Sequence, residues 1–188
     1  MKRILITGAN SYIGTSFEKY IFDHFAGRYQ VDTIDMIDGS WRERSFVGYD
    51  SVFHVAGIAH SDNGKISDEK ARLYYAVNTD LTIETAKKAK AEGVKQFVFM
   101  SSAIVYGDSA PIGIQKIITK ETLVAPTNCY GDSKVQAYHG LRLAIFLAFL
   151  QNLCRTSNNL CFVQYELCWQ YKQDFCYACN LFFYILNP

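Results

Sequence analysis

The chain has 188 residues, of which 49% are hydrophobic and 20% charged, and its net charge is +1 at pH 7. This composition is typical of a globular protein with one well-buried core and excludes a disordered chain. The balanced charge gives no basic surface for nucleic acid, and no apolar run reaches the length of a membrane span or a secretory signal. We therefore expect a soluble cytoplasmic protein with neither nucleic-acid nor membrane partners.

Apolar strands and amphipathic helices alternate from the first residue to about residue 134. The apolar spacing from Ile13 to Phe25 repeats at i, i+4, i+7 and i+8, as one face of a helix does. Ser67 and the acidic pair after it predict the start of a second helix, which Gly93 would end. The predicted helices are residues 13–25 and 67–92, and the predicted strands are residues 3–7, 30–36, 51–55 and 94–101. This order predicts an α/β protein whose parallel sheet is covered on both faces.

The segment from Gly8 to Gly14 joins the first strand to the first helix. Gly8 would supply the turn, and Gly14 would let the helix pack closely on the strand. Free backbone amides and the positive end of the helix dipole would then meet at one point, which favours a bound pyrophosphate. The alternative interpretation is an ordinary helix cap at a tight turn.

An acidic residue about 20 positions beyond such a turn can accept hydrogen bonds from a ribose. Asp35 lies 21 residues beyond Gly14, near the end of the second predicted strand, and Asp38 is a rival for the same contact. The alternative is that both are surface aspartates. An acid here favours NAD over NADP because it would repel a 2′-phosphate. Arg42 and Arg44 follow closely enough to leave NADP open.

Tyr130 and Lys134 stand at i and i+4 and so share one face of a predicted helix. A free tyrosine has a pKa of about 10, too high for a base at neutral pH. A neighbouring ammonium group and a cationic nicotinamide ring would stabilise the phenolate and lower that pKa. A serine of the segment SSAIVYG, residues 101–107, could hydrogen-bond the same substrate oxygen. The alternative for the tyrosine and lysine is an ordinary surface pair.

Together these segments resemble the extended short-chain dehydrogenase/reductases, and among them the NAD-dependent epimerase/dehydratase group that includes UDP-glucose 4-epimerases. The resemblance covers about residues 2–138 and rests on TGANSYIG, VFHVAG, VNTDLT, FVFMSSAIVYG and YGDSK. It implies a Rossmann-like doubly wound parallel sheet, truncated in this chain after the Tyr130–Lys134 helix.

The resemblance also implies which residues form the site. The catalytic residues would be Ser102, Tyr130 and Lys134. The cofactor contacts would be Gly8, Asn10, Ser11, Tyr12, Ile13, Gly14, Asp35, Asp38, Ala56, Gly57, Asn78, Tyr130 and Lys134. Ser11 departs from the family, where this middle position of the turn is usually glycine. Because serine is a good N-cap, we expect it to be tolerated, so that Ser11→Gly leaves NAD binding intact or tighter in a titration.

The implied activity is reversible hydride transfer between NAD and a nucleotide-sugar, with the tyrosinate removing the hydroxyl proton. Epimerisation, dehydration and reduction are all open as outcomes. One alternative is an NAD(P)-dependent carbonyl reductase, which net turnover of NADH or NADPH would reveal. Another is a non-catalytic NAD-binding module. The resemblance further implies a homodimer.

Residues 139–188 do not continue the alternating pattern. They hold only five charged residues but eleven aromatic residues and five of the six cysteines. The family's R-P and Y-G motifs and its substrate domain are not recognisable after Tyr138. We therefore expect an NAD-binding Rossmann domain over residues 1–138 and an atypical tail over residues 139–188, and hypothesise that a frameshift or truncation has replaced the usual C-terminal half. The sheet would then lack its last strands and expose apolar surface, and the chain could be inactive.

The cysteines and histidines give no strong metal signal. Cys176 and Cys179 form a lone CxxC, which is weak evidence for zinc, and cytoplasmic thiols are expected to be reduced. Cys154, Cys161 and Cys168 are spaced by seven, which suits core packing equally well. His54 lies inside a predicted strand and is expected to be packed or backbone-bonded, and neither it nor His60 is expected to act in catalysis. We predict no metal site.

Overall fold

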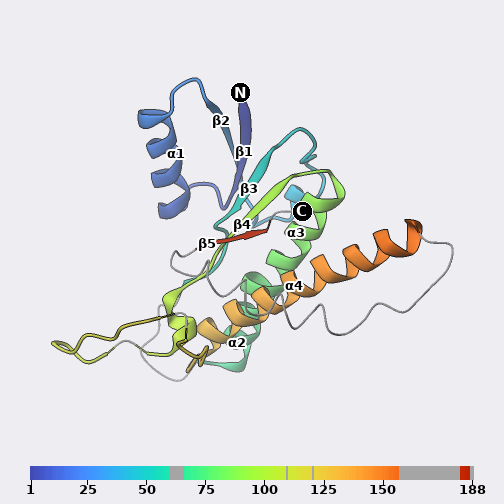
Figure 1. Cartoon of the computed structure of the whole chain (residues 1–188). Coiled ribbons are helices and arrows are strands. Elements are labelled where there is room, and N and C mark those ends of the chain that lie inside the picture. The colour runs from blue at the N-terminus through green and yellow to red at the C-terminus, as the bar shows by residue number, and fades with distance from the viewer. Residues whose placement is uncertain (60–65, 109, 120, 157–182, 187–188) are drawn as a thin grey trace.

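A computed structural model describes residues 1–59, 66–108, 110–119, 121–156 and 183–186 (Figure 1). The strands in these ranges are β1 (Lys2–Thr7), β2 (Tyr29–Ile34), β3 (Ser51–His54), β4 (Gln96–Met100) and β5 (Phe183–Leu186). The helices are α1 (Tyr12–His24), α2 (Asp68–Tyr74), α3 (Leu81–Ala91) and α4 (Cys129–Thr156), with short 3-10 helices η1 (Ser40–Arg42) and η3 (Ala103–Tyr106) and a π-helical segment η2 (Tyr75–Asp80). The strands and helices predicted from the sequence are confirmed to within about two residues at each end.

The strands form one sheet in the order β2-β1-β3-β4-β5. The first four strands are parallel, and the order places β1 in the middle of them, so the predicted doubly wound parallel sheet is confirmed. The hypothesis that the usual C-terminal half is replaced predicts a sheet without its last strands; at that edge the structure has one strand from the tail. Strand β5, from the tail, pairs antiparallel with β4, with Phe97 opposite Leu186.

Side chains of β1 alternate between the two faces of the sheet, as a strand requires. Ile4 and Ile6 pack with Phe53 and Phe17 under α1, where the two phenylalanine rings meet edge to face at 4.8 Å. Leu5 points to the opposite face and joins the larger core, to which α3 and α4 contribute Ala89, Ala137 and Leu141. The sheet is therefore covered by α1 on one face and by α3 and α4 on the other (Figure 1).

The helical stretch predicted for residues 67–92 is present but not uniform. Ser67 caps its start by accepting a hydrogen bond from the Lys70 amide at 3.2 Å, and Gly93 follows its end with φ +81°. Within it, the amide of Leu81 donates to the carbonyl of Ala76, five residues back, which is the hydrogen bond of a π-helix. The sequence pattern did not predict this widened turn.

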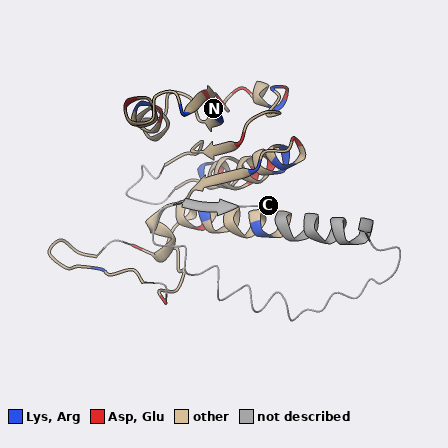
Figure 2. Ribbon diagram, turned by 45° about the horizontal axis from the view of Figure 1, so that its top comes forward, with Lys and Arg blue, Asp and Glu red and all other residues tan. Residues whose placement is uncertain are grey.

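Helix α4 runs without interruption through position 138, the last residue of the resemblance recognised in the sequence. It packs closely on α3, because a Cβ added at Gly140 would lie 2.1 Å from Cδ1 of Ile83. Within the described residues, none of the helices combines the length and apolar character that a membrane crossing requires. Figure 2 shows basic and acidic positions mixed on the helices, in keeping with the near-zero net charge.

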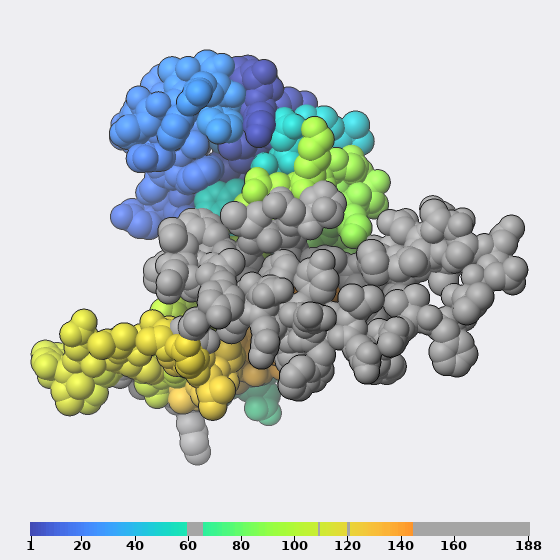
Figure 3. All heavy atoms as spheres, in the orientation of Figure 1, coloured from blue at the N-terminus to red at the C-terminus, as the bar shows by residue number. Residues whose placement is uncertain are grey.

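The segment between η3 and α4 projects from the body of the molecule, as the yellow-green spheres of Figure 3 show. A turn at Gly113, with φ +88°, reverses the chain, and the exposed residues Ile112 and Leu123 lie along the projection. At its base the Lys116 ammonium donates to the carbonyl oxygens of Tyr106 and Asp108, at 2.9 and 2.8 Å.

Candidate functional site

The glycine turn after β1 has the geometry that the sequence predicted. Gly8 has φ +87°, and a Cβ added there would lie 3.0 Å from the backbone of Ala56. Gly14 is buried against the strand, because its Cβ would meet Ile6 and the carbonyl of Gly8, each at 3.3 Å. The Ser11 hydroxyl caps α1 by accepting from the Gly14 amide at 3.1 Å. Ser11 itself has φ −71°, so its backbone does not require glycine.

The start of α1 is open to an anion. The amides of Gly8 and Ala9 both donate to the carbonyl of Ile34, which fixes the turn on the end of β2. Among the described residues, no acceptor is hydrogen-bonded to the amides of Tyr12 and Ile13, the first two of the helix. These amides and the positive end of the helix dipole suit a phosphate group. Asn10, within the same turn, adopts a left-handed backbone conformation with φ +63°.

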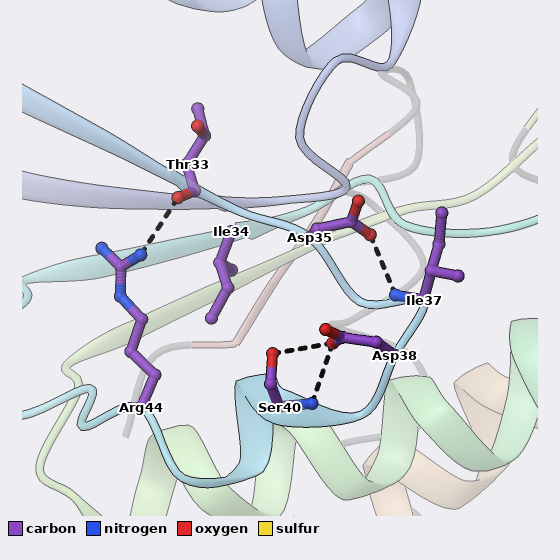
Figure 4. A pocket seen from close by; sticks show the side chains of 7 residues that line it. All are labelled: Thr33, Ile34, Asp35, Ile37, Asp38, Ser40 and Arg44. Atoms are coloured by element: carbon purple, nitrogen blue, oxygen red, sulfur yellow. Dashed lines mark hydrogen bonds between the residues drawn. The ribbon is translucent and has the colours of Figure 1, made fainter.

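A hollow of about 380 Å³ adjoins this turn at the carboxyl end of β2 (Figure 4). Its lining residues are Thr33, Ile34, Asp35, Ile37, Asp38, Ser40 and Arg44. Asp35 accepts a hydrogen bond from the Ile37 amide at 2.9 Å, and Asp38 accepts from the amide and hydroxyl of Ser40. Those bonds from Ser40 lower the pKa of Asp38. Two exposed carboxylates in one hollow next to the glycine turn suit the hydroxyl groups of a ribose.

Arg42 and Arg44, the two arginines that could bind the 2′-phosphate of NADP, have different surroundings. The Arg42 guanidinium is held by the carboxylate of Glu84 on α3. Arg44 lines the hollow and donates to the carbonyl of Thr33 and to the hydroxyl of Tyr49, both at 3.3 Å. The hollow is therefore lined by one arginine and two carboxylates. Because this charge is net negative, it favours a ribose without a 2′-phosphate.

The residues after β3 lie between the glycine turn and α4. The backbone of Ala56 packs against the turn at Gly8. A Cβ added at Gly57 would lie 2.9 Å from Oδ1 of Asn78 and 3.2 Å from Nζ of Lys134. Asn78 is fully buried, and its amide group bonds to both backbone groups of Ile58. The structure thus brings Gly57 and Asn78 next to Lys134, and Asn78 serves there to tie β3 to the helices.

Ser102, Tyr130 and Lys134 gather at the carboxyl end of β4. Ser102 follows β4 and caps η3. Tyr130 opens α4, where its ring centroid lies 5.9 Å from that of Tyr74. The start of α4 rests on η3, because a Cβ added at Gly131 would lie 3.1 Å from the carbonyl oxygen of Ile104. The tyrosine and the lysine are thus held one helical turn apart, beside the turn that begins with the serine.

A second tyrosine near this point is chemically different. Tyr75 donates a 2.8 Å hydrogen bond to the carboxylate of Asp132. That bond, followed by burial, raises the pKa of Tyr75 to about 12. Tyr75 therefore keeps its proton at neutral pH and is not suited to act as a base.

Lys134 is 5% exposed, an unusual degree of burial for a lysine. Its ammonium donates to the carbonyl of Met100 at 3.2 Å and lies 4.9 Å from the ring centroid of Phe99. Burial lowers its pKa from 10.5 to about 8. An ammonium with so little compensation is costly to the fold, and such groups are concentrated at functional sites.

Lys134→Met is accordingly expected to raise the free energy of unfolding at pH 7 by about 2 kcal/mol. In the parent protein, between pH 8 and 10.5, the unfolded chain keeps the lysine proton that the folded chain has lost. The free energy of unfolding of the parent protein therefore rises with pH across that window, and this rise should be absent from Lys134→Met. Urea unfolding at several pH values measures both effects. Lys87→Met, at an exposed position of α3, is the control and should change little; a destabilised Lys134→Met would contradict the prediction.

Two groups of residues at the site were missed by sequence reasoning. Thr33 and Ser40 line the hollow, but nothing in their spacing signals a ligand. Thr82 and Ser133 are fully buried polar residues behind the site. They lie inside the segments VNTDLT and YGDSK that carry the family resemblance, so the signal was present although it was not interpreted.

Several earlier candidates take no part in this arrangement. The described residues contain no cluster of three or more histidine, cysteine or acidic side chains arranged for a metal. His54 is packed inside the sheet, as expected. The side chains of Cys154, Cys161, Cys168, Cys176, Cys179 and His60 lie outside the part of the chain whose side chains the structure describes.

The parallel sheet, the open helix start and the acidic hollow define a dinucleotide-binding α/β protein. Residues 4–145 match the NAD dependent epimerase/dehydratase family, and the chain belongs to that family. It is 31% identical over 150 residues to a UDP-glucose 4-epimerase of Vibrio cholerae, an alignment that covers 72% of this chain and 45% of the relative. The human UDP-glucose 4-epimerase is 27% identical over 165 residues, which cover 71% of this chain and 46% of that protein.

Solved structures agree on the fold. A short-chain dehydrogenase/reductase superfamily protein from Agrobacterium tumefaciens, solved with bound NAD, superposes with a TM-score of 0.61 at 22% identity, over 75% of this chain and 44% of that one. The UDP-Glc/GlcNAc 4-epimerase from Campylobacter jejuni gives a TM-score of 0.60 at 21% identity, over 78% and 50%. The chain spans less than half the length of the two epimerases that it matches in sequence.

Proposed function

We propose that the chain binds NAD and acts on a nucleotide-sugar, as an epimerase or dehydratase with Ser102, Tyr130 and Lys134 as catalytic residues. The observation that carries the proposal is the convergence at one edge of the sheet. The glycine turn follows β1, the acidic hollow follows β2, and the Tyr130–Lys134 pair stands against the end of β4. Ligands of open α/β sheets bind at this carboxyl edge.

The described residues fit the parts of NAD. The open amides of Tyr12 and Ile13 would hold the pyrophosphate at the helix start. Asp35 and Asp38 would accept hydrogen bonds from the adenosine ribose in the hollow. The space at Gly57 beside Lys134, which a Cβ would fill, leaves room for the nicotinamide end. When bound, NAD would supply a hydride acceptor and donor for a sugar carbon.

The protein's own groups would move and hold the proton. Tyr130 would accept the proton of a sugar hydroxyl, with Ser102 hydrogen-bonded to the same oxygen. Lys134 would stabilise the phenolate form of Tyr130, which accepts the proton and becomes the neutral phenol, across one helical turn. The burial of Lys134 strengthens that interaction because little water screens it. General acid–base catalysis of this kind requires a base whose pKa lies near the working pH.

The domain arrangement follows as part of the proposal. Residues 1–138 would form the NAD-binding unit, and a nucleotide-sugar would need further contacts that the relatives make over a longer chain. The epimerase from Campylobacter jejuni is described as acting on UDP-Glc and UDP-GlcNAc, which makes a UDP-sugar the first substrate to test. We also propose a cytoplasmic homodimer, which the family resemblance implies and sedimentation velocity would test.

The deciding experiment combines NAD binding with turnover. Purified chain is titrated with NAD and NADP, and then incubated with UDP-glucose while UDP-galactose and NADH are both measured. Interconversion without net NADH supports an epimerase, whereas net consumption of NADH or NADPH with a carbonyl substrate would identify a reductase. NAD binding without any turnover would reduce the protein to a binding module. Failure to bind either dinucleotide would overturn the proposal.

A further inference from the structure

His54 ends β3 as a fully buried titratable side chain, and no proposed step uses it. Its Nδ1 lies 2.8 Å from the hydroxyl of Thr7, and its Nε2 lies 3.0 Å from the hydroxyl of Thr82. The rings of Phe97 and Phe99 stack against it at 5.6 and 6.3 Å. An imidazole with both nitrogens bonded and aromatic rings beside it is fixed in one orientation.

The neighbouring bonds also fix its tautomer. The single hydroxyl proton of Thr82 is donated to the carbonyl of Asn78, at 2.8 Å. Thr82 must therefore accept from His54, so Nε2 carries the proton and Nδ1 accepts from Thr7. Burial and the nearby charge of Lys134 lower the pKa of His54 to about 3, which keeps the ring neutral.

The same chain of bonds continues to the start of α4. The side-chain amide of Asn78 donates to the hydroxyl of Ser133 at 3.1 Å. That hydroxyl donates to the carbonyl of Tyr130 at 2.8 Å. The hydroxyl of Thr79 donates to the carbonyl of Ser133 at 2.7 Å, as a second tie to the same turn. Two runs of hydrogen bonds meet at Asn78, one at its backbone carbonyl and one at its side-chain amide. Together they join β1, through His54, to the backbone that carries the proposed base.

We propose that His54 is a positioning residue: by donating to Thr82 it holds the π-helical turn at Asn78, and that turn holds Tyr130 and Lys134 in register with the end of the sheet. The inference rests on the proposed function for its catalytic consequence. Buried polar networks of this kind specify one arrangement because every partner is costly to leave unpaired. The π-helical turn supplies the geometry, since it lets the adjacent residues Asn78 and Thr79 both face α4.

Two conservative substitutions of His54 distinguish the hydrogen bond made by Nε2 from the one made by Nδ1. The amide nitrogen of His54→Gln can reach the position of Nε2 and donate to Thr82. The shorter His54→Asn reaches only the position of Nδ1 and loses that bond. Thr82→Val removes the hydroxyl at nearly constant volume, and Thr82→Ser restores it. The matched control is Thr85→Val, because the Thr85 hydroxyl makes the same kind of bond one turn along α3, to Leu81, without joining the network.

The first readout is amide hydrogen exchange over residues 75–82 and 129–134, which does not depend on turnover. His54→Asn and Thr82→Val are expected to speed exchange about tenfold in both segments, because the hydrogen bond that ties them to β3 is lost. His54→Gln, Thr82→Ser and Thr85→Val should stay close to the parent protein.

The second readout is kinetic. In the two disruptive variants kcat should fall about tenfold, because the proposed base is displaced from its working position, while KM and NAD affinity stay near the parent values. Thermal unfolding identifies any variant that is not folded, and Thr82→Val carries the test if His54→Asn is lost. Unchanged hydrogen exchange at residues 129–134 in Thr82→Val, or equal effects of His54→Gln and His54→Asn, would overturn the inference. If the parent protein turns over no nucleotide-sugar, the proposed function fails, while hydrogen exchange still decides the role of His54.

Discussion

Replacing Tyr130 by phenylalanine is expected to lower nucleotide-sugar turnover by about 10²- to 10⁴-fold, the usual contribution of a positioned acid–base group. The ring and its packing near Tyr74 are kept, and only the hydroxyl that would exchange the proton is removed. NAD affinity should change little, because the proposed pyrophosphate and ribose contacts lie on α1 and at the end of β2. The measurement is initial-rate turnover of UDP-glucose alongside an NAD titration.

The control for this substitution lies on the same helix. Tyr138 stands two turns further along α4 and interacts with Arg142, so Tyr138→Phe removes a tyrosine hydroxyl away from the proposed site. It should leave turnover near the parent rate. If Tyr130→Phe retains full turnover, or if both variants lose it equally, the tyrosine is not the base.

Gly8→Ala is expected to lower the free energy of unfolding by about 3 kcal/mol and to weaken NAD binding at least about tenfold. Two costs combine at this position. The left-handed φ of +87° is unfavourable for alanine, and the new Cβ would press on the backbone of Ala56 at 3.0 Å. Because the contact is with backbone, relief requires the glycine turn or the end of β3 to move, and either shift would displace the proposed phosphate site.

Gly27→Ala separates these two costs. Gly27 also has a positive φ, +76°, but no described atom lies within 4 Å of its would-be Cβ. Its substitution should cost only the conformational term, about 1 kcal/mol, and should leave NAD binding unchanged. Chemical unfolding and NAD titration of both variants give the comparison. Equal losses of stability and affinity would show that the contact between Gly8 and Ala56 is unimportant.

Local patterns predicted most of the fold. The helix starting at Ser67 and ending before Gly93 was predicted correctly from its cap, its first-turn acids and its terminal glycine. The π-helical turn inside it was not, because its side chains bond partners remote in the sequence: Thr82 contacts His54, 28 residues earlier, and Thr79 donates to Ser133, 54 residues later. The pairing of β5 with β4 was missed for the same reason: its register depends on contacts remote in sequence, and no turn signal links the two strands.

In the candidate site, too, local features could be predicted from the sequence, whereas features that depend on distant contacts could not. The capping role of Ser11 was predicted from its residue type and is confirmed by the bond to Gly14. The catalytic assignment of Ser102, Tyr130 and Lys134 remains a prediction, which the structure makes concrete by placing all three around the end of β4. The burial of Lys134 and the separate surroundings of Arg42 and Arg44 needed the structure, because both depend on which distant elements pack against them.

The pairing of β5 with β4 has a consequence for biosynthesis. Strand β4 is complete once residue 100 has left the ribosome, but its partner comes from residues 183–186. Throughout translation of the intervening segment one edge of the nascent sheet stays unpaired, and unpaired edges recruit strands from other chains. Yield of soluble protein should therefore depend on chaperone capacity and translation rate more strongly than the stability of the finished fold would indicate.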